Sequence, residues 1–144
     1  MRALVLAIAI AAVTPAHAQP ASWEIRVPER IELAQGASGI VPITISVDRG
    51  FSVSKDGPVI IDVVPEPGVT IKKRRLGRPD AADPEADLPR FVIPVRADTA
   101  GDHTVKLRIR LWLCGGKVCR PLDVKRQTTV AVAAAPAPAD PPTP

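Results

Sequence analysis

Residues 104–122 read T-V-K-L-R-I-R-L-W-L-C-G-G-K-V-C-R-P-L, and this stretch carries the clearest pattern in the chain. Aliphatic side chains fill every second position, with charged or aromatic side chains between them: Val105, Leu107, Ile109, Leu111 and Leu113 alternate with Lys106, Arg108, Arg110 and Trp112. A period of two is typical of a β-strand with one face in the core and the other in solvent. The stretch therefore predicts a half-buried strand.

A turn is expected directly after that strand. Gly115-Gly116 can supply it, because glycine takes positive φ without steric cost. The chain then returns through Val118 and Cys119, and Pro121 is expected to end the pairing because proline cannot donate to a ladder. The sequence thus predicts a short hairpin.

The chain's only two cysteines, Cys114 and Cys119, flank this turn. A hairpin can bring two Cα atoms close enough for a disulfide bond. Cys114 shares the parity of Trp112 and the charged residues, so its sulfur is expected at the surface or under a loop, not in the core.

The first eighteen residues have the features of a secretory signal peptide. Arg2 gives a positive start, residues 3–13 form a short apolar run, and Ala16-His17-Ala18 is a small-x-small cleavage site. The apolar run is too short to span a bilayer as a helix. We therefore expect a signal peptide at 1–18 and a mature chain that is periplasmic or secreted and does not span the membrane. Paired cysteines are expected in such an oxidising compartment.

Further short strands are expected along the rest of the chain, at residues 23–27, 31–33, 40–47, 59–64, 69–72, 91–97 and 124–132. Residues 51–58 are expected as an irregular connection and 73–89 as a long exposed excursion. Seven or eight short strands without a helix predict an all-β, immunoglobulin-like antiparallel β-sandwich, with its domain at 19–132. Residues 133–144 are alanine and proline without periodicity, which indicates a disordered tail.

Composition excludes several functions. The net charge of +4 is too small to indicate a nucleic-acid partner. Two cysteines with His103, the one histidine left after cleavage, are too few ligands for a metal site. There is no glycine-rich phosphate loop to bind a nucleotide, and no cofactor is expected. No recognisable nucleophile–base arrangement indicates hydrolysis.

The residues alone leave two roles open for the cysteine pair. It could be a structural staple, for which a ring of about six residues predicts only ~2 kcal/mol of stabilisation. It could instead be a redox-active dithiol, which needs an accessible sulfur and nearby positive charge. Arg110, Lys117 and Arg120 lie within a few residues of the cysteines. Outward parity and Arg110 favour Cys114 as the sulfur that a partner attacks first.

At these residues the chain resembles the periplasmic N-terminal domain of DsbD-type thiol:disulfide interchange proteins. The resemblance runs from about Trp23 to Val132 and is carried by four matching residues: Trp112, Cys114, Cys119 and Pro121. It implies that Cys114 and Cys119 are the reactive pair. It also implies that the pair passes electrons between a membrane reductase and thiol-redox proteins. The donor would be a separate protein, such as a membrane reductase or a thioredoxin-like protein. The alternative is a non-enzymatic secreted binding module with a structural hairpin disulfide.

The resemblance also implies a loop that caps the disulfide, and residues 72–78 are the corresponding stretch. This stretch holds the basic run Lys72-Lys73-Arg74-Arg75 together with Arg78. A solvated loop is the ordinary interpretation of such a run, and a docking patch for an acidic partner or an anionic surface is the other.

Overall fold

The computed structural model describes residues 23–137 and 141. The predicted signal peptide lies outside the described residues, as does much of the predicted tail. The described residues form ten strands and one turn of 3-10 helix: β1 (Trp23–Arg26), β2 (Arg30–Ala34), β3 (Ser38–Val47), β4 (Phe51–Val53), β5 (Ile60–Pro65), β6 (Val69–Thr70), β7 (Arg75–Leu76), η1 (Arg78–Asp80), β8 (Phe91–Ala97), β9 (Gly101–Gly115) and β10 (Val118–Ala133). No helix in the described part of the chain is long and apolar enough to cross a membrane.

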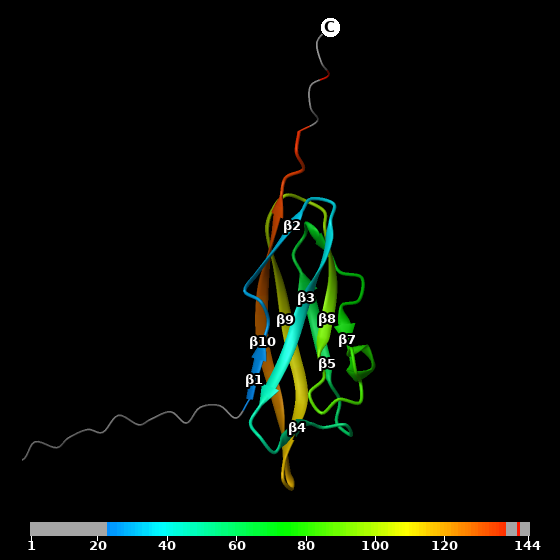
Figure 1. Cartoon of the computed structure of the whole chain (residues 1–144), viewed down its shortest axis with the longest axis vertical. Helices are drawn as coiled ribbons and strands as arrows, with labels where there is room; N and C mark the ends of the chain where they lie inside the picture. The colour runs from blue at the N-terminus through cyan, green and yellow to red at the C-terminus, as the bar shows by residue number, and fades with distance from the viewer. Residues whose placement is uncertain (1–22, 138–140, 142–144) are drawn as a thin grey trace, which may run out of the picture.

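Two sheets face each other, which confirms the predicted sandwich (Figure 1). One sheet has the order β1-β3-β8-β6, and the other has the order β2-β10-β9-β5-β7, with β4 added beside the end of β9. The pairing of β2 with β10 is parallel, and the other pairings are antiparallel. β1 and β2 belong to different sheets, so the chain changes layers between Arg26 and Arg30.

The core lies between the sheets and follows the alternation of the sequence. All five aliphatic residues of β9 are buried, as the period of two predicts. The facing sheet contributes buried residues from β3 and β8: Val41, Ile43, Ile45, Phe91, Ile93, Val95 and Ala97. A continuous apolar layer therefore holds the two sheets together.

β10 differs from the expectation. Pro121 does not end the pairing, because Pro121 lies opposite Trp112 within one ladder that joins β9 and β10 from Gly115/Val118 to Gly101/Val132. The reason is visible farther along β10, where the N–H of Thr129 donates to the carbonyl of Glu29 on the side away from β9. Residue 121 has the same parity as residue 129, so the N–H that proline lacks would also point away from β9. The proline costs the ladder no hydrogen bond.

Two stretches predicted to be irregular carry structure. Residues 51–58 begin with β4, which pairs with β9, and residues 73–89 contain β7 and η1. Within the excursion, Leu76 and Ala81 reach the core, so this loop is anchored and not wholly exposed. Because β4 and β7 lie in these two stretches, the described residues form ten strands and not the seven or eight that were expected.

We expect Ile109→Ala to destabilise the domain by about 2–5 kcal/mol, because Ile109 is 0% exposed at the centre of β9 and truncation would leave a cavity. Lys106→Ala, on the solvent face of the same strand, should change stability by less than about 0.5 kcal/mol. Urea unfolding of both variants gives the comparison. Equal losses of unfolding free energy in the two variants would contradict the assignment of Ile109 to the core face of β9 and Lys106 to its solvent face.

Candidate functional site: the disulfide hairpin

Cys114 and Cys119 are joined by a disulfide, as the sequence predicted. They occupy directly opposite positions on β9 and β10, with 4.0 Å between their Cα atoms. This short separation is typical of a pair whose backbone N–H and C=O groups point away from each other. The cysteines are therefore brought together by the ladder itself, and the disulfide spans the two strands.

The pair lies at the end of the β9–β10 hairpin, which extends beyond the rest of the sandwich (Figure 1). Gly116 makes the turn with φ of 60°, a value suited to the first position of a two-residue turn. Gly115 is needed for a different reason, since a Cβ there would lie 2.3 Å from Cε1 of Phe51. The Phe51 ring thus closes the end of the core beneath the hairpin.

The two sulfur-bearing residues differ in exposure. Cys114 is half-buried, because β4 lies on one side of it and β10 on the other, with Ser52 and Cys119 as its direct neighbours. Cys119 is exposed on β10. Both side chains lie on the outer face of the sheet, which confirms the parity argument for Cys114.

Residues 54–58, which follow β4, lie against the strand that carries Cys114. The N–H of Ser54 donates to the Trp112 carbonyl at 2.8 Å, and the N–H of Gly57 donates to the Ser54 hydroxyl at 3.0 Å. The Trp112 ring packs on Gly57, where a Cβ would come within 2.9 Å of the indole, yet Trp112 remains 39% exposed. A tryptophan next to the disulfide, half covered by this segment, is thus part of the site.

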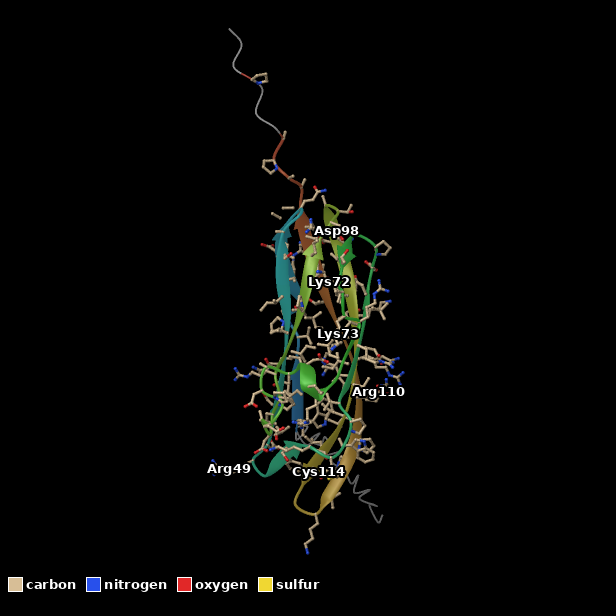
Figure 2. The ribbon with its side chains drawn as sticks, turned by 90° about the vertical axis from the view of Figure 1, so that its right-hand side faces the viewer. Arg49, Lys72, Lys73, Asp98, Arg110 and Cys114 are labelled. Atoms are coloured by element: carbon tan, nitrogen blue, oxygen red, sulfur yellow. A yellow bond between two sulfur atoms is a disulfide. The ribbon has the colours of Figure 1, made fainter. Side chains whose placement is uncertain are left out.

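The resemblance implied a cap over the disulfide at residues 72–78, but residues 72–76 lie away from the disulfide (Figure 2). β7 pairs with β5 where Leu76 lies opposite Ile61, and Ile61 lies opposite Ile109, five positions before Cys114. Figure 2 shows Lys72 and Lys73 well separated from Cys114 along the long axis of the molecule.

Arg78 has a role that the sequence did not reveal. Its guanidinium donates to four backbone carbonyls, those of Val53, Ser54, Pro84 and Ala86, at 2.7–3.1 Å. It is half-buried and so does not belong to a solvated basic run. The Val53 N–H also donates to the Asp87 carbonyl at 2.9 Å. Arg78 therefore ties the segment beside the disulfide to the loop that follows η1.

Arg110 is held by an acidic neighbour. Its guanidinium contacts the Asp62 carboxylate at 2.7 Å, and Arg75 contacts the same carboxylate at 2.6 Å. The hydrogen bond from Arg75, followed by that from Arg110, lowers the pKa of Asp62 below its ordinary value. Arg110 is thus engaged by Asp62. Of the three basic residues expected near the cysteines, Lys117 and Arg120 have no ion-pair partner among the described residues.

A shallow groove lies elsewhere, along β1 and the middle of β9 and β10, and its lining includes none of residues 112–121. Among the described residues, no group of three histidine, cysteine, aspartate or glutamate side chains is placed to hold a metal ion. The site consists of the disulfide and the side chains that surround it.

No family model matches this chain, and no curated protein matches it in sequence. Solved structures match it by fold. Escherichia coli alpha-2-macroglobulin matches with a TM-score of 0.50 and 17% identity, over 80% of this chain and 7% of that one. Domains 4 and 5 of the S-layer protein SbsC match with a TM-score of 0.43 and 13% identity, over 77% and 45% of the two chains.

The BIgI domain of beta protein from S. agalactiae, solved bound to CEACAM1, matches with a TM-score of 0.44 and 13% identity, over 79% and 99% of the two chains. This chain therefore spans less than half of the first two proteins. At such identities the matches show the fold alone, an immunoglobulin-like sandwich, and none of the three names describes a thiol–disulfide exchange protein.

Replacing Arg78 by methionine should loosen the segment beside the disulfide, because four carbonyls lose their donor. We expect a loss of about 1–3 kcal/mol, the usual cost of leaving buried polar groups unpaired, and faster amide hydrogen exchange at Val53. Arg74→Met, in the exposed part of the same loop, is the matched control. Unchanged exchange at Val53 in the Arg78 variant would refute this role.

Asp62→Asn should alter the acid stability of the domain. Because the pKa of Asp62 is lowered in the folded state, its ion pairs contribute stability above the unfolded pKa of about 3.9, and that contribution fades as the pH falls below this value. The stability gap between wild type and variant, on the order of 1 kcal/mol for pairs this exposed, should be constant from pH 7 to 5 and narrower at pH 3. Urea unfolding at the three pH values measures it. A gap that widens on acidification would contradict the assignment.

Proposed function

We propose that this domain carries out thiol–disulfide exchange through Cys114 and Cys119, in the periplasm or outside the cell. The observation that carries the proposal is a disulfide with one exposed cysteine, Cys119, between residues that the backbone already holds opposite each other. The ladder of β9 and β10 continues from Val118 to Val132 beyond the bond, and the core lies beneath that ladder. The disulfide can therefore open and close on a scaffold that does not depend on it.

Energetics support this role. A ring of about six residues removes little entropy from the unfolded chain, worth ~2 kcal/mol, whereas burial of a single large aliphatic side chain contributes ~1.5–3 kcal/mol. The described part of the chain buries more than twenty hydrophobic residues in one cluster. The reduced domain should therefore stay folded, as a domain that cycles between dithiol and disulfide must.

The exposure of the two cysteines indicates the order of events. A partner thiolate attacks Sγ of exposed Cys119, a bond forms between the two sulfurs, and the Cys114 sulfur leaves with the electron pair as a thiolate. A second partner thiol then attacks the mixed disulfide, which leaves the partner oxidised and Cys119 reduced. This order differs from the sequence-based preference for Cys114, which did not account for β4 beside it.

The partner in this proposal is a separate thiol-redox protein, either a membrane reductase or a thioredoxin-like protein. The support is the resemblance to DsbD-type N-terminal domains at Trp112, Cys114, Cys119 and Pro121, together with the placement of these four residues on one outer face of the hairpin. The reaction needs no cofactor on this chain, because the electrons pass directly between sulfur atoms.

A non-enzymatic binding module is the second candidate, and one observation favours it. On the outer face of the other sheet, Ile40 lies opposite Pro94, and Pro42 lies opposite Val92. Ile40 is 54% exposed and Val92 is 43% exposed. Contiguous exposed apolar groups on a sheet are typical of an interaction surface, and in this case the disulfide would be a structural staple.

The reduction potential separates the two functions. If the domain carries out thiol–disulfide exchange, equilibration of the mature chain with glutathione buffers should give a reduction potential above about −300 mV. Reduction should leave the far-UV circular dichroism spectrum unchanged and alter the fluorescence of Trp112. A potential below that value, or loss of the fold on reduction, would contradict the exchange function and favour the binding module with a structural disulfide.

Single cysteine variants test the order of attack. In Cys114→Ala the remaining thiol of Cys119 is exposed, and in Cys119→Ala the remaining thiol of Cys114 lies half-buried beside β4. We expect the first variant to react with a neutral aromatic disulfide at least several-fold faster at equal thiolate fraction. In urea the two rates should become equal. Faster reaction of Cys114 in the folded state would reverse the assignment.

A further inference from the structure

One edge of β10 is open beside the disulfide. β10 pairs with β9 along its length, but β2 covers its other side only from Thr129 to Ala133. Among the described residues no strand pairs with that side between Val118 and Thr128. An uncovered strand edge presents backbone donors and acceptors to any chain that approaches it.

The register shows which backbone groups this edge offers. The N–H of Thr129 and the carbonyl of Ala133 both bond toward β2, so the odd-numbered residues of β10 direct their backbone groups away from β9. The N–H and C=O of Cys119 therefore face the open side, in agreement with the 4.0 Å spacing to Cys114.

The open stretch is short. Pro121 has no N–H to offer, and farther along the edge the Lys125 carbonyl already accepts a hydrogen bond from Arg126 at 2.9 Å. Arg126 also donates to the Ile25 carbonyl of β1 at 3.0 Å, which ties this part of the edge to the other sheet. The free groups thus gather around Cys119 and continue to Asp123.

We propose that the edge of β10 from Cys119 to Asp123 docks an extended segment of the redox partner, which pairs as an added antiparallel strand and places its own cysteine opposite Cys119. This inference rests on the proposed exchange function. Directly opposed residues of a sheet direct their side chains to the same face, so the partner sulfur lies on the outer face beside the disulfide. Hydrogen-bonded opposite residues lie about 5.5 Å apart between Cα atoms, which is within the range that a disulfide can bridge.

The arrangement also sets the line of attack. Cys114, Cys119 and the added residue lie in one row across the sheet, because each is the direct neighbour of the next strand. A sulfur that approaches from the open edge reaches Cys119 from the side away from Cys114, which is the in-line direction for displacing the Cys114 thiolate. The basic side chains of Lys117 and Arg120 are exposed at this end and have no ion-pair partner among the described residues. They favour acidic residues next to the partner cysteine.

Backbone N-methylation tests the proposal. The probe is a synthetic peptide with one cysteine between two valines and flanking glutamates, whose reaction with the oxidised mature chain is followed by mass spectrometry as the mixed disulfide forms. A methyl group on the cysteine amide nitrogen removes the N–H that would donate to the Cys119 carbonyl. We expect this peptide to react about tenfold more slowly than the parent, the factor that corresponds to a hydrogen bond worth about 1.4 kcal/mol.

The matched control carries the methyl group on the following residue, whose N–H points away from β10. This control peptide should react at the rate of the parent peptide. The rate of each peptide with the domain is first divided by the rate of the same peptide with oxidised glutathione, which removes differences in thiol reactivity. Equal rates for the two methylated peptides would overturn strand addition while leaving the exchange function intact. Failure of dithiothreitol to reduce the folded domain would instead remove the exchange function on which the inference rests.

Discussion

The hydrogen-bonded ladder between β9 and β10 is the constraint on which the rest of this molecule depends. It joins the two longest strands, positions one layer of the core, and brings Cys114 opposite Cys119 with no contribution from the sulfurs. A disulfide in the core of a sandwich closes a long loop between two sheets, whereas this one connects neighbours on a single sheet. The contact between the two sheets is therefore made by the side chains of the core and not by the disulfide.

The sequence predicted those parts of the fold that rest on local pattern. Alternation from Val105 to Leu113 identified the core face of β9, and the glycines at 115 and 116 located the turn. The bonded cysteines at its base followed from the same stretch. These features can be predicted from the period of a strand and the conformational freedom of glycine, which depend only on residues that are consecutive in the sequence.

The surroundings of the disulfide could not be read in the same way, because they depend on residues that are distant in sequence. β4 is three residues long and is recognisable only by its place beside β9. Arg78 stands next to a run of exposed basic residues, yet it donates to carbonyls up to 25 positions away. Pro121 was expected to stop the ladder, since the sequence does not show which side of a strand a missing N–H faces.

Pro121 also bears on how the domain behaves in a crowded solution. An exposed strand edge invites a second copy to join it, and continuous edge-to-edge pairing is a common first step toward fibres. With proline in the middle of the free stretch, two copies aligned along this edge would lack a donor in each chain, and Lys125 and Arg126 would bring like charges together nearby. The same residue that leaves the hairpin intact thus discourages the molecule from polymerising with itself.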